Sequence, residues 1–147
     1  HSTRLFPEAW VWHKRRTDFR KFYRQVFNSG IARINLEKRH PGTLKLVHLL
    51  PAVFTVGIIG LILLSIIGLI TGICRLAWMP WVPIVLFAII IFTDSAMKNK
   101  SLRVGLLSIP AAFVQLMGYG CGFIKAWWKR CVKGEDEFTA FEKNFYK

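Results

Sequence analysis

Acidic side chains are scarce in this sequence. It contains 8 Asp and Glu residues against 21 Lys and Arg residues, and half of the acidic ones lie in the C-terminal tail, at Glu135, Asp136, Glu137 and Glu142. Nowhere do two carboxylates, a nucleophile with its base, or a glycine-rich phosphate loop occur at the spacing that catalysis needs. The sequence therefore excludes a complete catalytic site within this chain.

Cysteine is sparse as well. Cys74, Cys121 and Cys131 give an odd count, and none has a second Cys or a His nearby at the spacing of a metal site. We therefore predict no metal site in this chain. Cys74 and Cys121 are expected to be small apolar packing residues, and Cys131 a surface thiol.

A secretory leader is also missing from the sequence. The chain opens His1-Ser2-Thr3-Arg4, with neither an initiating Met nor a short apolar region followed by a cleavage site. We interpret the chain as part of a longer protein and expect an upstream portion to precede it.

What the sequence does contain is three long uncharged stretches, Leu49–Cys74, Leu76–Thr93 and Val104–Ile124. At about 1.5 Å per residue, each is close to or above the length that crosses a hydrocarbon core of roughly 30 Å. A soluble chain of 147 residues has too little polar surface to cover three such helices. Because 53% of the residues are hydrophobic and the net charge is +13, we predict a multi-pass membrane protein with strongly basic parts in water.

The basic residues indicate the orientation in the membrane. More than half of the 21 Lys and Arg residues precede the first span, Arg75 lies in the first link, and Lys98, Lys100 and Arg103 lie in the second. Positive loops stay cytoplasmic, so residues 1–48 and the second link are predicted inside and Arg75 outside. Anionic lipid headgroups explain this charge beside membrane spans, so we predict no nucleic-acid partner.

The third stretch leaves two alternatives open for the C-terminal tail. A full crossing would place the basic tail outside, whereas a re-entrant or interfacial segment would leave it in the cytoplasm. The uncharged length of Val104–Ile124 favours a crossing. Pro110 and the cluster Gly118, Gly120 and Gly122 instead suit an irregular path.

Two elements are predicted before the first span. Ala9–His13 alternates around two tryptophans as a short strand, whose partners are expected in the upstream portion. After a helix-start signal at Thr17 and Asp18, apolar side chains recur every three or four residues on one helical face. An aromatic stripe with a basic flank is typical of an amphipathic helix in the membrane interface, and packing on a folded domain is the alternative. The stripe consists of Phe19, Phe22, Tyr23, Val26, Phe27, Gly30, Ile31 and Ile34.

Small residues mark predicted helix contacts inside the membrane. Gly68 and Gly72 in the first span, and Gly118 and Gly122 in the third, have the Gly-x-x-x-Gly spacing that permits close packing of helices. Packing within this chain is the expected role, with dimerisation through the same spacing as the alternative.

Four tryptophans are predicted to lie at the membrane interface, where indole rings are favoured. Trp78 and Trp81 lie in the first link, and Trp127 and Trp128 follow the third stretch between basic residues.

Several segments together resemble a known family. They are Trp12–Thr17 (WHKRRT), Phe22–Arg33 (FYRQVFNSGIAR), Gly118–Phe123 (GYGCGF), Ala126–Arg130 (AWWKR) and Glu137–Phe141 (EFTAF). In this order they resemble the end of the catalytic domain and the membrane region of membrane-bound family 2 glycosyltransferases, especially the type common in Bacteroidetes bacteria. The likeness covers nearly the whole chain.

The resemblance implies an upstream GT-A domain, an α/β domain that binds a nucleotide sugar and a divalent metal, Mg²⁺ or Mn²⁺, through acidic motifs absent here. This chain itself is expected to hold no cofactor. The implied activity is transfer of the sugar to a lipid-linked or polysaccharide acceptor at the cytoplasmic face of a bacterial inner membrane. Processive members often carry Gln-x-x-Arg-Trp, whereas here Gln25 is followed by Val26-Phe27-Asn28 and the next Arg is Arg33. Processivity is therefore not implied.

His13, Arg15, Arg16, Gln25 and Arg33 are the candidate substrate-binding residues. Transfer from a nucleotide diphosphate sugar builds negative charge on the leaving group, which Arg and His side chains can stabilise. We place His13 and Arg16 near the diphosphate, and Gln25 and Arg33 nearer the acceptor. Lipid contact or a purely structural role is the alternative for each residue.

The predicted protein is mainly α-helical and integral to the membrane. Residues 1–16 end the truncated α/β domain, 17–48 form the basic interfacial helix and its lead-in, 49–124 form three transmembrane helices, and 125–147 form a basic interfacial tail. A non-catalytic membrane scaffold or transporter-like subunit is the alternative function. Transporters usually carry several polar residues inside the bundle, whereas Gln115 is the one strongly polar residue of the third stretch.

Overall fold

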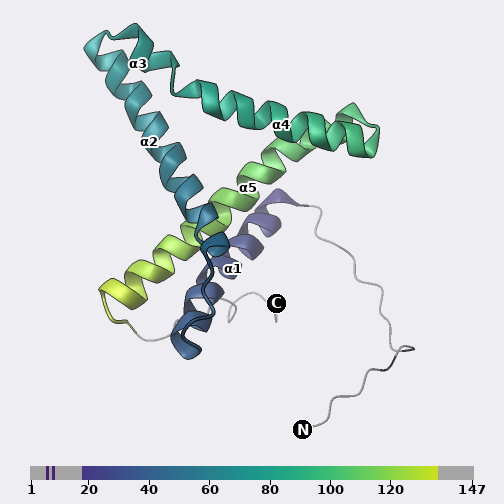
Figure 1. Ribbon diagram of the computed structural model, residues 1–147, viewed down its shortest axis with the longest axis vertical. Coiled ribbons are helices and arrows are strands. Elements are labelled where there is room, and N and C mark those ends of the chain that lie inside the picture. The colour runs from purple at the N-terminus through teal and green to yellow at the C-terminus, as the bar shows by residue number, and fades with distance from the viewer. Residues whose placement is uncertain (1–5, 7, 9–17, 136–147) are drawn as a thin grey trace.

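The computed structural model describes Phe6, Glu8 and residues 18–135, and every regular element within these residues is a helix. Figure 1 shows the chain in order. The predicted strand Ala9–His13 and the tail from residue 136 onward lie outside the described residues. The elements are α1 (Phe19–Arg39), η1 (Leu46–His48), α2 (Leu50–Thr71), α3 (Cys74–Trp78), α4 (Trp81–Asn99), α5 (Leu102–Trp127) and η2 (Trp128–Val132).

Helix α1 begins and ends where the sequence predicts. The Arg20 backbone N–H donates to the Asp18 carboxylate at 2.8 Å, which satisfies one of the N–H groups left open at a helix start. At the other end the His40 N–H donates to the Leu36 carbonyl oxygen, and Pro41 follows. Proline disfavours a helical conformation in the residue before it, so the helix stops at Arg39.

The three long apolar helices form the sides of a triangle (Figure 1). Helices α2 and α4 meet at the first corner, which contains α3. Helices α4 and α5 meet at the second corner, and the start of α2 crosses α5 near the third corner. Three phenylalanine rings, Phe54, Phe87 and Phe113, join the three sides, with ring centroids 5.2 to 5.9 Å apart. Their mutual contacts join the three helices.

The first corner is built by polar side chains inside an apolar sequence. The buried Ser65 hydroxyl donates to the Ala77 carbonyl oxygen at 2.6 Å and accepts from the Trp81 indole N–H at 3.0 Å. Gly72 ends α2 with φ of +71°, a left-handed conformation that glycine adopts without strain. The link is thus a short helix between two turns, and α4 begins at Trp81.

The prediction that Gly68 and Gly72 permit close helix packing is correct for Gly68 and wrong for Gly72. A Cβ on Gly68 would lie 2.4 Å from the Ala77 backbone nitrogen, so Gly68 does allow α3 to approach α2. Gly72 has open space around its Cα and contributes its conformation instead of a close contact. The same spacing therefore serves two different purposes, because Gly72 lies at the end of its helix.

The second corner is a tight turn between α4 and α5. Lys100 has φ of +50°, and Ser101 caps α5 by accepting the Val104 backbone N–H. Gly105 then lets α5 approach α4 so closely that an added Cβ would lie 2.8 Å from the Ala96 side chain. Helix α5 continues without interruption through Pro110, so the irregular path that Pro110 suited as an alternative is absent, and the departure from α-helical geometry comes later, in the π-helical turn η2.

The well-buried core lies where α1, α2 and α5 meet. It contains Ile31 and Ile34 of α1, Ala52 of α2, and Phe123 and Ala126 of α5. Away from this junction the apolar side chains of the frame are largely exposed, for example Ile70 at 80% and Leu69 at 71%. Exposed apolar area on this scale requires a non-aqueous environment.

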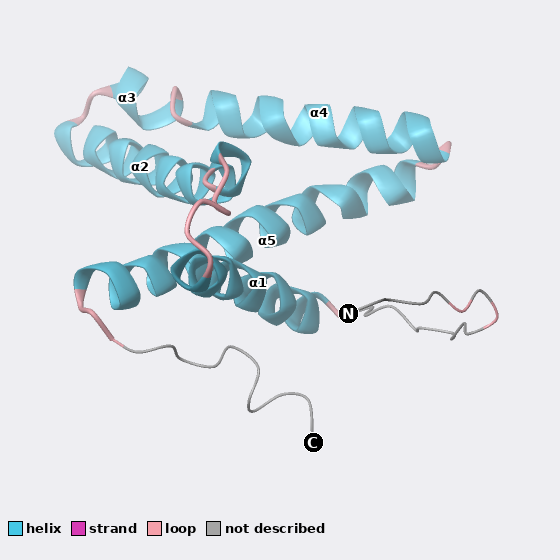
Figure 2. Cartoon of the chain, turned by 60° about the horizontal axis from the view of Figure 1, so that its bottom comes forward, coloured by secondary structure: helices cyan, strands magenta, loops and turns pink. Residues whose placement is uncertain are grey.

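Three helical segments are long and apolar enough to cross a membrane: Leu46–Thr71, Cys74–Asn99 and Leu102–Val132. This agrees with the predicted membrane protein of mainly α-helical structure. Figure 2 shows how α1 is arranged against this frame, below α5 and away from α4.

Candidate functional site

The candidate site is built on a backbone contact between α1 and α5. A Cβ on Gly30 would lie 2.2 Å from the Tyr119 carbonyl oxygen, and a Cβ on Gly122 would lie 2.0 Å from that of Phe27. Such distances are below any real Cβ contact, so glycine is required on both helices. Gly118 and Gly122 thus have the predicted packing role, with α1 as the partner.

The aromatic stripe of α1 is the face that makes this contact. Gly30, Ile31 and Ile34 are buried, while Phe19 and Tyr23 at the N-terminal end are 44% and 38% exposed. The stripe therefore packs mainly on another apolar helix of this chain. Burial and the neighbouring Cys121 side chain raise the pKa of Tyr23, so its phenol remains protonated at neutral pH.

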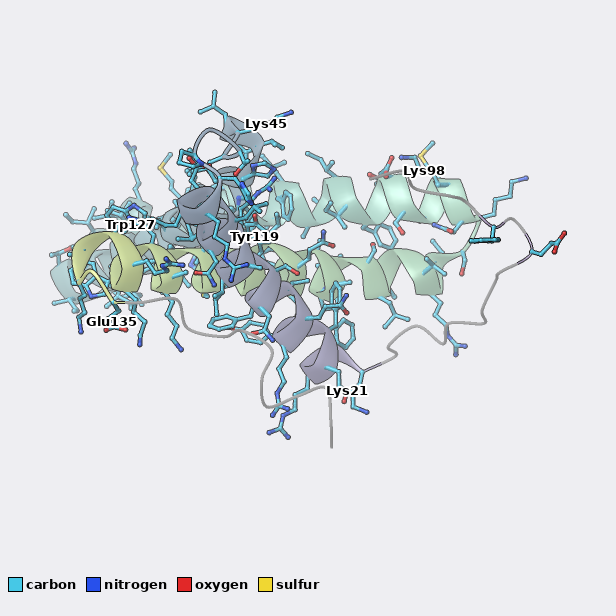
Figure 3. All side chains as sticks on the ribbon, turned by 90° about the horizontal axis from the view of Figure 1, so that it is seen from below. Lys21, Lys45, Lys98, Tyr119, Trp127 and Glu135 are labelled. Atoms are coloured by element: carbon cyan, nitrogen blue, oxygen red, sulfur yellow. The ribbon has the colours of Figure 1, made fainter. Side chains whose placement is uncertain are left out.

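Arg33 is the candidate residue that the fold places in a polar cluster. Its guanidinium group Nη2 contacts His48 Nε2 and also lies beside the Tyr119 side chain. These three residues, hereafter the Arg33 cluster, come from α1, η1 and α5. Figure 3 shows Tyr119 where α1 crosses α5. Among the described residues no carboxylate pairs with Arg33.

Both ring nitrogens of His48 face donors of this chain. The Lys45 backbone N–H lies 2.9 Å from His48 Nδ1, and the Arg33 guanidinium contacts His48 Nε2. Arg33 is a donor only. The Arg33 guanidinium carries five N–H groups, so groups other than those that face His48 and Tyr119 can bind an acceptor oxygen.

Glu37 fixes the turn that brings His48 to Arg33. Its carboxylate accepts from the Gly42 N–H at 2.9 Å, the Thr43 hydroxyl at 3.0 Å and the Leu44 N–H at 2.6 Å. The hydrogen bond from Gly42 is the largest cause that lowers the pKa of Glu37, because it stabilises the ionised carboxylate. A carboxylate so engaged organises the chain between α1 and η1.

An apolar groove of about 240 Å³ adjoins the Arg33 cluster. Leu49 follows His48 directly, and Phe123 lies one helical turn after Tyr119. The groove is partly open, so an apolar chain can enter it. Its lining residues are Leu44, Leu49, Ala52, Phe123, Ile124 and Trp127.

A second polar contact joins α1 to the end of the apolar frame. Arg130 in η2 donates to the buried Asn35 side chain at 2.7 Å, and the Arg130 Nε is itself buried without a partner. One turn earlier, the Lys125 ammonium group lies 5.5 Å from the centre of the Phe27 ring. These contacts fix α1 along the last turns of α5.

No group of His, Cys, Asp and Glu side chains in the described part of the chain is placed to hold a metal ion. The carboxylates within residues 18–135 serve local structure: Asp18 caps α1, Glu37 fixes the turn, Asp94 pairs with Lys98 at 2.8 Å, and Glu135 pairs with Lys129 at 2.9 Å. The hydrogen bond from Lys129 lowers the pKa of Glu135. The divalent metal that the resemblance implies therefore finds no ligand set among these residues.

The other four candidate substrate-binding residues lie either outside the described residues or apart from Arg33. His13, Arg15 and Arg16 lie outside the described residues. Gln25 is exposed and lies about 12 Å before Arg33 along the axis of α1, so the fold does not bring these two side chains together.

The four predicted interface tryptophans are all about half exposed: Trp78 at 54%, Trp81 at 48%, Trp127 at 47% and Trp128 at 52%. Trp78 and Trp81 flank the α3 corner, and Trp127 and Trp128 lie at the end of α5. Their location at a lipid interface stays a prediction.

Sequence reasoning missed His48, Tyr119, Asn35 and Arg130. Tyr119 had a usable signal, because a large polar ring between Gly118 and Gly120 lies where two helices come close. The pairing of His48 with Arg33 had no such signal in the sequence, since it depends on the turn that Glu37 organises. Comparison with known proteins adds no further guide: no family model, no curated protein and no solved structure matches the chain.

Proposed function

We propose that this chain is the membrane region of a family 2 glycosyltransferase, which transfers a sugar from a nucleotide-sugar donor to a lipid-linked acceptor at the cytoplasmic membrane face. The donor and any metal would be bound by an upstream GT-A domain. The residues described here would hold the acceptor. The observation that carries the proposal is the Arg33 cluster beside an apolar groove.

A lipid phosphate suits the chemistry of this site. A phosphate oxygen is an acceptor that can bind N–H groups of the Arg33 guanidinium, and its charge balances an arginine that has no carboxylate partner among the described residues. The lining of the adjoining groove is apolar, as the hydrocarbon chain of the same lipid requires. Headgroup and chain would thus bind at neighbouring parts of one site.

The position of α1 supports a role in presenting the acceptor. Its exposed basic side chains, such as Arg20 and Arg24, suit the phosphate region of a lipid leaflet, while its buried face packs on α5. Any domain that precedes Asp18 would therefore begin at the membrane surface, about 22 Å from Arg33 along the axis of α1. This arrangement favours an acceptor delivered from the bilayer over one delivered from solution.

The binding step is tested with the purified chain in detergent and an isoprenyl monophosphate, with native mass spectrometry as the measurement. Arg33→Gln should weaken binding at least about tenfold, because a charge-assisted hydrogen bond is lost. Arg24→Gln, which changes an exposed arginine on the same helix, should bind as wild type does. The matching isoprenyl alcohol should bind weakly to both.

Two outcomes would contradict the lipid-acceptor assignment. If Arg33→Gln and wild type bound the isoprenyl monophosphate equally, Arg33 would not contact the phosphate. Equal, Arg33-dependent binding of phosphatidylglycerol would indicate a general phospholipid site.

The transfer step is tested on the full-length gene product. An upstream reading frame with Asp-x-Asp in a GT-A context, and sugar transfer to the isoprenyl phosphate by the whole protein, would support the enzyme. A start codon directly before His1 would support the non-catalytic scaffold instead. Turnover of a nucleotide sugar by residues 1–147 alone would contradict the division of roles proposed here.

A further inference from the structure

The connectivity of the chain places both ends of α5 near the same side of the frame. If α2 leaves the membrane face that carries α1, it ends at the α3 corner on the other face, and α4 returns to the first face at Asn99. Helix α5 begins three residues later, at Leu102. Its far end contacts α1 again, through the hydrogen bond between Arg130 and Asn35.

Contacts along α5 agree with this arrangement. Gly120 approaches the first turn of α2, where an added Cβ would lie 2.3 Å from the Pro51 carbonyl oxygen. Gly105 approaches the last turns of α4, at Ala96. Since these are the ends of α2 and α4 that lie away from α3, the part of α5 between Gly105 and Gly120 runs from one to the other. Figure 1 shows α5 as the side of the triangle opposite α3.

The polar surface of α1 limits how deep α5 can lie. Helices α1 and α5 run side by side in the same direction, from the contact of Tyr23 with Gly118 to that of Asn35 with Arg130. A helix as basic as α1 cannot enter the hydrocarbon core at low cost. The C-terminal half of α5 is therefore held at the level of α1. The remaining part, 102–117, is about 24 Å long, shorter than a hydrocarbon core of roughly 30 Å.

Positive charge also separates the α3 corner from the face that carries α1 and both ends of α5. Among the described residues, Arg75 is the one Lys or Arg at the α3 corner. The others lie on α1, at the start of α2, or at the two ends of α5, where anionic lipid headgroups would meet them. They are Arg20, Lys21, Arg24, Arg33, Lys38, Arg39, Lys45, Lys98, Lys100, Arg103, Lys125, Lys129, Arg130 and Lys133.

We infer that α2 and α4 cross the bilayer as a hairpin, while α5 lies shallowly along the leaflet that carries α1 and contacts its anionic headgroups with both ends. The apolar flanks of α5, such as Leu106 and Leu107, face the adjoining acyl chains. The C-terminal tail then begins on the same face as α1. This arrangement does not depend on the enzymatic role proposed above.

The native cysteines allow a direct test of sidedness. Cys74 lies at the α3 corner and Cys131 at the end of α5, and both are exposed. We would remove Cys121 with Cys121→Ala, prepare forms that retain only Cys74 or only Cys131, and add a reference Lys38→Cys on α1 in a cysteine-free chain. Each form is labelled with a membrane-impermeant maleimide in sealed spheroplasts and in inverted vesicles.

Cys131 should label from the same face as Lys38→Cys, and Cys74 from the opposite face. Labelling of Cys131 from the face of Cys74 would overturn the inference, and so would labelling of Cys74 from the face of Lys38→Cys. Lys133→Cys, at an exposed position two residues further, serves in place of Cys131 if that thiol reacts from neither face, and the same outcomes decide.

Depth is measured independently with spin labels in vesicles of phosphatidylcholine and phosphatidylglycerol. Val114→Cys near the middle of α5 should report a shallow position, accessible to a polar relaxation agent. Ile62→Cys near the middle of α2 should report the bilayer centre. If the spin label at Val114→Cys lay as deep as the label at Ile62→Cys, α5 would cross the membrane and the inference would be overturned.

Discussion

Replacing Gly122 by alanine is expected to separate α1 from α5. An added Cβ would lie 2.0 Å from the Phe27 carbonyl oxygen, and real contacts of this kind stay above 3.0 Å. The two backbones must therefore move apart by about 1 Å, and neither can rotate out of the way as a side chain would. Overpacking a tight contact usually costs about 1 to 3 kcal/mol, so we expect a loss of that size in the free energy of unfolding.

The same interface offers a graded series of controls. At Gly118 the nearest atom to an added Cβ is a Val26 side-chain methyl at 2.6 Å, which can shift by rotation, so Gly118→Ala should cost less than Gly122→Ala. At Gly57 in α2 nothing lies within 4 Å of an added Cβ. Gly57→Ala should be neutral or stabilise the protein by up to about 1 kcal/mol, because alanine has the higher helix propensity.

Reversible unfolding in mixed micelles of dodecyl maltoside and dodecyl sulfate, followed by tryptophan fluorescence, measures these differences. Stability should fall in the order Gly57→Ala, Gly118→Ala, Gly122→Ala. Equal stability of Gly57→Ala and Gly122→Ala would refute the assigned backbone contact between α1 and α5.

Three further predictions concern the turns of the frame and use the same unfolding measurement. Gly72→Ala should cost about 1 to 2 kcal/mol from its left-handed backbone alone, whereas Gly68→Ala should also displace α3; a neutral Gly72→Ala would contradict the assigned turn. Ser65→Ala should cost about 1 to 3 kcal/mol, because the Ala77 carbonyl oxygen and an indole N–H lose their buried partner, and Ser65→Thr, which keeps the hydroxyl, should cost less. The folded-state pKa of Glu37 is lowered, chiefly by the Gly42 N–H, so its stabilisation is present above the unfolded pKa of roughly 4.3 and is lost as the pH falls through the folded value. Wild type should thus be more stable than Glu37→Gln at neutral pH and lose this advantage in acid, and a constant difference across that range would exclude the carboxylate as its source.

Local signals in the sequence were sufficient for the elements themselves. The cap at Asp18 and the stop before Pro41 bound α1, and uncharged length identified the three apolar helices. Gly68 and Gly72 show where such reasoning fails, because their spacing equals that of Gly118 and Gly122 and their roles differ. Whether a glycine meets a neighbouring helix or ends its own depends on where the helix stops, and Ile73 and Cys74 continue the apolar stretch past Gly72.

The candidate site was harder to predict because its residues meet only through tertiary contacts. The family resemblance and the ability of arginine to stabilise negative charge made Arg33 a candidate. His48 reaches it through the turn that Glu37 organises, and Tyr119 reaches it because Gly118 and Gly122 let α5 approach α1. Periodicity within one helix carries no information about either approach.

The way in which His48 and Tyr119 reach Arg33 has a mechanical consequence for the site. The contact of α1 with α5 is made by backbone atoms at Gly30 and Gly122, and backbone atoms cannot adjust by changing rotamers. The depth of Arg33 in the membrane is therefore set by the depth of α5, while the position of His48 is set by where α2 begins. A change in lipid thickness that tilts α2 against α5 would change the contact between Arg33 and His48, so we expect phosphate affinity at the Arg33 cluster to vary with acyl-chain length. Binding of the isoprenyl monophosphate in bilayers of graded thickness would measure this dependence, and constant affinity across the series would show that the two helices move as one rigid body.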